Sequence, residues 1–277
     1  MSSPQTPKLV AEADLIAVSS LVQAELDAAK TLVPQVRTHL SHDEMLNAES
    51  TLQAVVIASA VSVRAEQVIE AMEKGLHVLC GKPLSPSPEI SQQVLDAYNK
   101  SLKKHPKQKV MCGFSRRFDA SYRDAHQKVM SGDLGRLAHA AGIFIHTSIH
   151  DVDLALWFLG HESVVKTISS AGVTAVQQDM LDHTDRDNAL TIIEFYVRPA
   201  DIATLTSLGL LRSLQGGQEF TDCCLHDEEL PVKLEGAVQA VAICCLLQES
   251  LISGKEIEFD ESGRRLTPAT DVKGSKL

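Results

Sequence analysis

The spacing of apolar residues over positions 55–80 gives the clearest indication of the fold. A short apolar run rich in β-branched residues opens this segment, and a second apolar run closes it. Between them, apolar residues recur at helical spacing, at Ala65, Val68, Ile69 and Met72. Gly75 then supplies the left-handed residue that commonly ends a helix. The pattern predicts a strand, a helix and a second strand, with the two strands parallel in one sheet.

The same alternation continues to about residue 135. Residues 85–104 predict a helix with Ser87 as its N-cap. The apolar run at 109–114 predicts a buried strand, and residues 117–132 predict another helix. This order of elements is typical of a parallel sheet covered by helices.

The pattern changes in the second half of the chain. Residues 148–160 and 234–254 predict apolar helices. Residues 163–176 and 189–196 alternate between apolar and polar positions, as half-exposed strands do. This half is therefore expected to be α+β.

Composition and charge restrict the partners of the chain. Its 277 residues carry a formal net charge of -10 and no cluster of Lys and Arg among aromatics, so nucleic acid is not an expected partner. The sequence has no signal-like apolar segment and no uninterrupted apolar stretch of membrane-spanning length, so a cytoplasmic location without membrane contact is expected. The six cysteines show no C-x-x-C pair and no zinc-site spacing with histidine, so buried, reduced thiols and no metal are expected.

Three strings of the sequence carry candidate chemistry: HVLCGKP at 77–83, GFSRRFDASY at 113–122 and GIFIHTSIHDVDLALWFLG at 142–160. With the later strings DNALTIIEFY and LISGKEIEFDESGRRL, they resemble the glucose-fructose oxidoreductase and inositol 2-dehydrogenase (Gfo/Idh/MocA) family, in the same order. The resemblance runs from about Leu15 to Leu266. It implies a Rossmann domain that binds NAD or NADP, and a second domain that holds a sugar or polyol for hydride transfer.

Pattern and resemblance together define the expected fold class. It is α/β, with an incomplete Rossmann-like parallel sheet followed by an α+β domain with a shortened open sheet. Residues 1–120 are expected to form the partial Rossmann nucleotide-binding domain, and residues 121–277 the substrate and oligomerisation domain. Family members commonly associate through the second sheet, which makes a homo-oligomer a candidate assembly.

The resemblance assigns the catalytic roles to Lys82 and His150. Oxidation of a carbinol requires a base for the hydroxyl proton, and a histidine is suited to that task. A nearby ammonium can orient the hydroxyl and stabilise developing oxyanion charge. The plainer interpretations are a solvated lysine at a strand end, and a histidine in an acidic helix N-terminus capped by Ser148.

The resemblance also implies contacts around this pair. Expected cofactor contacts are Ser59, Ala60, Ser62, Gly81, Lys82, Pro83 and Arg116. Expected substrate contacts are His146 and Asp153. Arg116 and Arg117 can also be interpreted as surface charges, and one of the two is expected at the cofactor.

The chain departs from the family pattern at the nucleotide loop. Residues 1–74 contain no glycine, whereas the fingerprint G-x-G-x-x-G needs glycines so that the backbone can approach the pyrophosphate. The apolar run at 15–20 resembles the family's second strand, so the first strand, loop and helix are expected to be absent. Weakened cofactor binding is therefore expected, and the sequence does not separate NAD from NADP.

Other departures affect the second sheet and the site. Only six residues separate Gly135 from Gly142, and the segment 197–217 replaces several strands of the family's sheet. Three site positions also differ, because an aspartate, a glutamate and a histidine of the family are replaced by His146, Gly81 and Arg64. An imidazole at position 146 carries no negative charge but can still hydrogen-bond a polyol.

These observations leave two functional hypotheses. The first is an NAD(P)-dependent oxidoreductase for a sugar, an inositol or a related polyol, with weak or lost activity. The second is a non-catalytic regulator or scaffold of the same fold, because the family includes a galactose-responsive transcriptional repressor. Polyol-dependent reduction of the cofactor discriminates between them. A third interpretation, a coding sequence that lacks segments of the natural one, is tested by sequencing the transcript.

Overall fold

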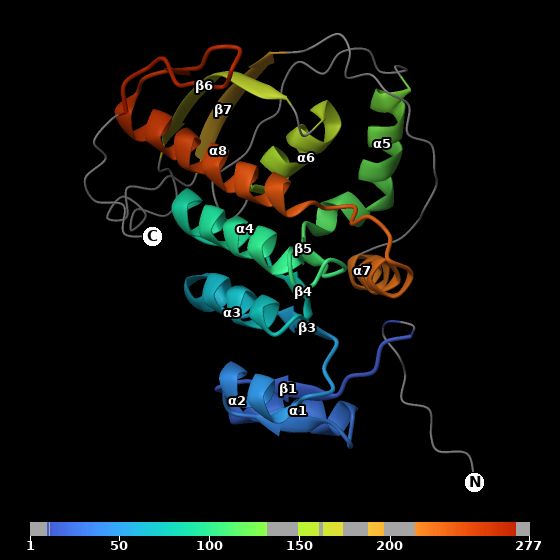
Figure 1. Cartoon of the computed structure of the whole chain (residues 1–277). Coiled ribbons are helices and arrows are strands. Elements are labelled where there is room, and N and C mark those ends of the chain that lie inside the picture. Colours follow the sequence, from blue (N-terminus) through green and yellow to red (C-terminus); the bar gives the residue numbers. More distant parts are fainter. Residues whose placement is uncertain are drawn as a thin grey trace.

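The computed structural model describes Val10 and residues 12–131, 149–160, 163–173, 188–196 and 214–269. Its helices are α1 (Gln23–Leu32), α2 (His42–Ala48), α3 (Val61–Glu73), α4 (Pro88–Leu102), the 3-10 turn η1 (Ser115–Phe118), α5 (Ala120–Met130), α6 (Ile149–Leu159), α7 (Leu214–His226) and α8 (Leu234–Ser253). Its strands are β1 (Ala17–Ser19), β2 (Arg37–His39), β3 (Ala54–Ile57), β4 (His77–Cys80), β5 (Val110–Cys112), β6 (Val164–Val173), β7 (Asn188–Tyr196) and β8 (Ile257–Glu258). Figure 1 shows these elements as layers, with β1 at one end, β3–β5 in the middle and β6–β7 at the other end.

The N-terminal half contains two parallel sheets. β1 pairs with β2, and β3, β4 and β5 form a separate sheet in that order. The predicted strand–helix–strand unit is confirmed, because α3 connects the parallel neighbours β3 and β4, with Ala54 opposite His77. Within the described part of the chain, no strand pairs with the second edge of β3. Among the described residues, β3 is therefore the edge strand of this sheet.

Local sequence explains where two of the covering helices begin and end. The Ser87 hydroxyl accepts a hydrogen bond from the Ile90 amide at 3.1 Å, which caps α4 as predicted. Gly75, after α3, has a φ of 80°, the left-handed conformation that glycine adopts without strain. A Cβ at position 75 would lie 2.8 Å from the His105 ring. The glycine therefore permits the tight return from α3 into β4.

The C-terminal half forms an antiparallel sheet in the order β7-β6-β8, in agreement with the predicted α+β pattern. α8 packs against α4, α6 and β6 and so joins the two halves (Figure 1). By length and composition alone, α8 is apolar enough to cross a membrane. Ala240, Val241 and Leu247 are buried by these neighbours, however, so α8 is the central helix of the core.

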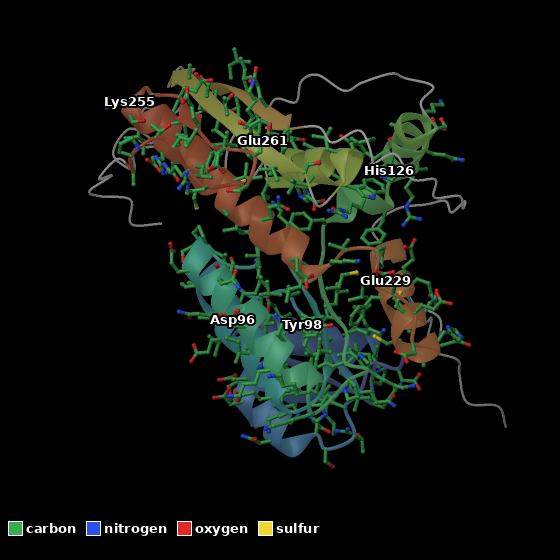
Figure 2. All side chains as sticks on the ribbon, turned by 45° about the horizontal axis from the view of Figure 1, so that its top comes forward. Asp96, Tyr98, His126, Glu229, Lys255 and Glu261 are labelled. Atoms are coloured by element: carbon green, nitrogen blue, oxygen red, sulfur yellow. The ribbon has the colours of Figure 1, made fainter. Side chains whose placement is uncertain are left out.

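An aromatic contact joins α5 to α6. His126 of α5, labelled in Figure 2, stacks on Trp157 of α6 with ring centroids 4.0 Å apart. Phe158 adds a tilted contact to the same imidazole. Burial lowers the pKa of His126, which favours the neutral ring. This contact fixes α6, which also carries His150, against α5.

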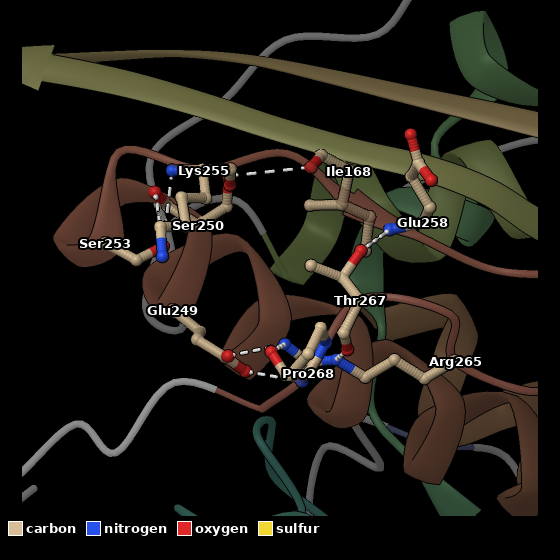
Figure 3. A network of polar contacts seen from close by, with 9 residues as sticks. All are labelled: Ile168, Glu249, Ser250, Ser253, Lys255, Glu258, Arg265, Thr267 and Pro268. Carbon is tan, nitrogen blue, oxygen red and sulfur yellow. Dashed lines mark hydrogen bonds and ion pairs between the residues drawn. The ribbon is translucent and has the colours of Figure 1, made fainter.

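A polar network ties the end of α8 to the segments around it (Figure 3). Arg265 binds both carboxylate oxygens of Glu249, at 2.8 and 2.6 Å. The Ser250 hydroxyl donates to the Lys255 carbonyl at 2.7 Å and accepts from the Ser170 amide at 3.0 Å. These bonds hold α8, β6 and the segment after β8 in one arrangement.

Several features differ from the sequence predictions. The patterns did not predict α1, β2, α2 or α7. Asp119 follows η1 and accepts from the Ser121 amide at 2.9 Å, so the helix predicted from residue 117 begins at Ala120. In agreement with the predicted reduced thiols, however, the six cysteines are free, and four of them are buried. The segment between Gly135 and Gly142 lies outside the described residues.

Candidate functional site

The carboxyl ends of β3, β4 and β5 meet at one edge of the central sheet. The Gly81 amide donates to the Ile57 carbonyl at 2.9 Å, and the Gly113 amide donates to the Cys80 carbonyl at 2.8 Å. These bonds extend the alignment of the strands to the residues that follow them. Lys82 comes shortly after β4, at the edge where open α/β sheets bind their ligands.

A buried arginine secures the segment that carries Lys82. Arg64, in α3, donates hydrogen bonds to the carbonyl oxygens of Pro83 and Ser59, both at 2.5 Å. The carbon of its guanidinium lies 3.3 Å from the place that a Cβ at Gly81 would occupy. The peptide bond between Lys82 and Pro83 is cis. Because Arg64 is only 7% exposed, it acts as an internal support for this turn.

His150 lies in the first turn of α6 and belongs to the same group of residues. Its ring meets Phe114 edge-on, with centroids 6.0 Å apart. Burial, followed by the positive charges of Lys82 and Arg116, lowers the pKa of His150 to about 4. The Nδ1 atom is buried and has no hydrogen-bond partner among the described residues. At neutral pH, His150 is thus an uncharged imidazole that can accept a proton.

Lys82 is electrostatically coupled to the same groups. Burial lowers the pKa of Lys82 most, and the positive charges of Arg116 and Arg64 lower it further. Since the charge of Lys82 also acts on His150, the structure brings the two predicted catalytic residues together.

Two consecutive arginines of η1 bind two acids of α6. Arg116 pairs with Asp151, the neighbour of His150. Arg117 binds Asp153 through two hydrogen bonds, Nε to Oδ2 at 2.7 Å and Nη2 to Oδ1 at 2.6 Å. The Arg116 and Asp151 side chains are 33% and 27% exposed, whereas those of Arg117 and Asp153 are 2% and 1% exposed. Arg116 therefore borders the site, and Arg117 belongs to the core.

The prediction that Asp153 contacts the substrate needs correction. Arg117 occupies both carboxylate oxygens, and Asp153 is buried. Burial raises the pKa of this carboxyl, against the opposing effect of the Arg117 charge. Asp153 is a positioning residue that fixes α6 to η1. The other predicted substrate contact, His146, lies outside the described residues, as does Ser148.

Three predicted cofactor contacts surround the beginning of α3. Ala60 is at the N-cap position, and no side chain caps this helix. The Ser59 hydroxyl donates to Gln67 at 2.6 Å, while Ser62 lies in the first turn. The positive end of a helix suits an anionic or carbonyl oxygen of a ligand.

These features fit one part of a dinucleotide. The start of α3, the turn at Lys82 and the side chain of Arg116 can border its nicotinamide end. Residues 1–74 contain no glycine, so they provide no glycine-rich cradle for the pyrophosphate. Among the described residues, no cluster of three or more His, Cys, Asp or Glu side chains could hold a metal ion.

The sequence patterns did not predict the supporting role of Arg64. The sequence does contain a sign of this role, because two positions, 64 and 81, depart from the family pattern together, as Arg64 and Gly81. The structure explains the pairing, since a side chain at position 81 would press on the Arg64 guanidinium.

The parallel sheet with Lys82 and His150 at its carboxyl edge, followed by an antiparallel sheet, defines a two-part α/β protein of the nucleotide-binding class. Residues 2–107 match the family model described as an oxidoreductase family with an NAD-binding Rossmann fold. Residues 2–107 are thus similar to the Gfo/Idh/MocA oxidoreductase family, in agreement with the resemblance found in the sequence.

Curated relatives include inositol dehydrogenases of bacteria. The NAD(+)-dependent scyllo-inositol 2-dehydrogenase of Bacillus subtilis is 32% identical over 164 residues, which cover 52% of this chain and 45% of the relative. The myo-inositol 2-dehydrogenase of Thermotoga maritima is 24% identical over 206 residues, which cover 68% of this chain and 59% of the relative. The chain thus spans about half the length of the curated relatives that it matches.

Solved structures share the fold. A scyllo-inositol dehydrogenase from Lactobacillus casei, with bound NAD(H) and scyllo-inositol, superposes with a TM-score of 0.73 at 21% identity. The superposition covers 90% of this chain and 92% of that chain. The arrangement of the two halves is therefore that of a known dehydrogenase fold.

Proposed function

We propose that this protein oxidises a hydroxylated metabolite, a sugar, an inositol or a related polyol, by hydride transfer to NAD or NADP. The observation that carries the proposal is the convergence of Lys82 and His150 at the carboxyl edge of the central sheet. The names of the inositol dehydrogenases among its relatives support the substrate class. A cytoplasmic location is part of the same proposal.

The two residues divide the work as follows. The bound nicotinamide would accept the hydride from the carbinol carbon. His150 accepts the proton of the hydroxyl, because its imidazole is uncharged at neutral pH. Lys82 orients the same hydroxyl and stabilises the negative charge that develops on its oxygen.

The residues proposed to hold the cofactor are those at the start of α3, the turn after β4 and Arg116. They are Ser59, Ala60, Ser62, Gly81, Lys82, Pro83 and Arg116. Arg64 positions this turn through its bonds to Pro83 and Ser59. His146 remains a proposed substrate contact, four residues before His150 in the sequence.

Calorimetric titration with NADH and NADPH tests cofactor binding before any substrate is known. Micromolar binding is expected, followed by cofactor reduction with scyllo-inositol or myo-inositol. The variants His150→Gln and Lys82→Met should each lower kcat by roughly 10²–10⁴-fold, because each removes a group that acts in proton transfer or charge stabilisation.

Matched controls separate chemistry from folding. His226→Gln and Lys104→Met change the same residue types at exposed positions of the structure and should leave kcat unchanged. Folded protein that binds neither cofactor, or equal turnover by the site variants and the controls, would contradict the proposal.

A second candidate function is a non-catalytic regulator or scaffold that keeps the fold. The observation that favours it is the lack of any glycine in residues 1–74, where a catalytic dinucleotide site needs a close backbone approach. Nucleotide binding without turnover of any polyol would support this function over the first.

We also infer a homo-oligomer, through the second sheet. Among the described residues, β7 is an edge strand, and its residues Leu190 and Ile192 are exposed on one face. Exposed apolar residues on a sheet edge favour pairing with another chain.

A further inference from the structure

Positive side chains from three separate elements gather around Lys82. Arg64 comes from α3, Lys82 follows β4, and Arg116 lies in η1. The charges of Arg64 and Arg116 both act on Lys82, and those of Lys82 and Arg116 act on His150. The site therefore concentrates positive charge at the place where the substrate is proposed to react.

The charge of Arg64 has no negative partner among the described residues. Two of its nitrogen atoms donate to the carbonyl oxygens of Pro83 and Ser59, and carbonyls carry no net charge. Its third nitrogen, Nε, is buried without an acceptor. Burying such a charge without a counter-ion is unfavourable, so an anion nearby would stabilise the site.

The acids nearest to the site do not compensate for this charge. Asp151 pairs with Arg116, and Arg117 occupies both oxygens of Asp153. Gly81 adds no carboxylate, although its Cβ position lies 3.3 Å from the guanidinium of Arg64. A negative group of a bound ligand would balance the charge of Arg64 at this edge of the sheet.

We propose that the substrate of this site is an anionic polyol, a sugar acid or a sugar phosphate, whose negative group binds at Lys82 and Arg116 within the field of Arg64. This inference rests on the proposed function, since it names the class of hydroxylated substrate. The hydroxyl to be oxidised faces His150, and the carboxylate or phosphate faces the arginines. Arg64, which does not touch the reacting atoms, is a specificity-determining residue.

Two matched pairs of ligands test the inference on the purified full chain with saturating NADH. D-Glucuronate differs from D-glucose by a carboxylate, and myo-inositol 1-phosphate differs from myo-inositol by a phosphate. Calorimetry is expected to give at least about tenfold tighter binding of the anion in at least one pair, and the ratio should fall at high salt. The two pairs distinguish a carboxylate from a phosphate. Equal affinity within both pairs, or no detectable binding of either anion, overturns the inference.

Variants of Arg64 make the test specific to this side chain. Arg64→Gln should bring the anion-to-neutral affinity ratio to within about threefold of one, whereas Arg64→Lys should keep most of the preference, because it keeps the charge. The ratio of the two affinities does not change when a variant preparation contains less active protein, so it is compared instead of the affinities themselves. Arg264→Gln, which removes an exposed arginine far along the chain, should leave the ratio unchanged. An unchanged ratio in Arg64→Gln overturns the assigned role of Arg64.

The same titrations give different outcomes for a failure of this inference and a failure of the proposed function. Failure of NADH and NADPH to bind would remove the oxidoreductase proposal, while the ligand pairs could still be titrated into the protein alone. Binding of cofactor with preferential turnover of the neutral polyol would keep the oxidoreductase proposal and overturn the anionic substrate. Anion preference that disappears only in the presence of the cofactor would assign the positive charge to the cofactor's phosphates, which also overturns it.

Discussion

Arg116 and Arg117 follow one another in η1, and each binds an aspartate of α6, yet the two ion pairs lie in different surroundings. The Arg116–Asp151 pair is about one-third exposed and borders His150. The Arg117–Asp153 pair is almost completely buried. Arg117 also lies over the Trp157 ring, with its guanidinium carbon 5.6 Å from the ring centroid. Arg116 thus borders the site, whereas Arg117 lies in the core.

The difference between the two ion pairs shows how a buried pair can position a site that it does not contact. The buried pair fixes η1 against α6, and these two elements carry Arg116 and His150. The exposed pair can then exchange its partner for a ligand without disturbing the core. Position in the fold, and not the type of residue, buries Arg117 in the core and leaves Arg116 at the border of the proposed site.

The largest expected effect comes from breaking the buried pair. Arg117→Ala should lower the free energy of unfolding by about 3–5 kcal/mol, because Asp153 would remain buried without a partner. Urea denaturation followed by circular dichroism measures the change. A loss below about 1 kcal/mol, the range of exposed pairs, would contradict the assignment of this pair to the core.

A double replacement checks the cause of that loss. Arg117→Met combined with Asp153→Leu removes both charges and refills the space with apolar groups. It should recover most of the lost stability, since a buried pair contributes little net free energy over well-packed apolar residues. A double variant as unstable as Arg117→Ala would point to lost packing on Trp157 instead of the unpaired carboxylate.

The sequence predicted the elements of the central sheet well, for local physical reasons. Gly75 and Ser87 mark the ends of α3 and the start of α4, and their conformations depend on neighbours within a few residues. α7 was missed, because Gly216 and Gly217 near its start lower its helix propensity. Gly216 packs against Phe118, a tertiary contact that the local pattern does not contain.

The candidate site was predicted only in part. Lys82 and His150 were identified by the resemblance, and the structure places them in one electrostatic group. The role of Asp153 was predicted wrongly, because nothing in the local sequence distinguishes it from the more exposed Asp151. Its burial depends on the contact between η1 and α6, which are far apart in the chain.

An effect of intermediate size is expected when the exposed pair is broken, and it concerns the pKa of His150. Arg116→Gln should raise the pKa of His150 from about 4 toward 6.5, by a minor part of that difference, because burial and the charge of Lys82 lower it more than Arg116 does. The base form exists above the pKa, so kcat/KM should fall on the acidic side in both proteins, and the fall should begin at a higher pH in the variant than in the natural protein. NMR titration of the His150 ring gives the same pKa independently of activity. An unchanged pKa would show that burial alone sets it.

The smallest expected effect is the loss of stability when Arg116 is replaced, and its salt dependence compares the two ion pairs directly. Arg116→Ala should lower the free energy of unfolding by less than about 1 kcal/mol, since water already solvates much of this pair. Because salt screens exposed charges, this small loss should shrink further between about 0.05 and 1 M NaCl. The loss in Arg117→Ala should stay nearly constant over the same range, since the buried pair is out of reach of dissolved ions. Parallel denaturation series at several salt concentrations measure both slopes, and equal slopes would mean that the two arginines experience the same surroundings after all.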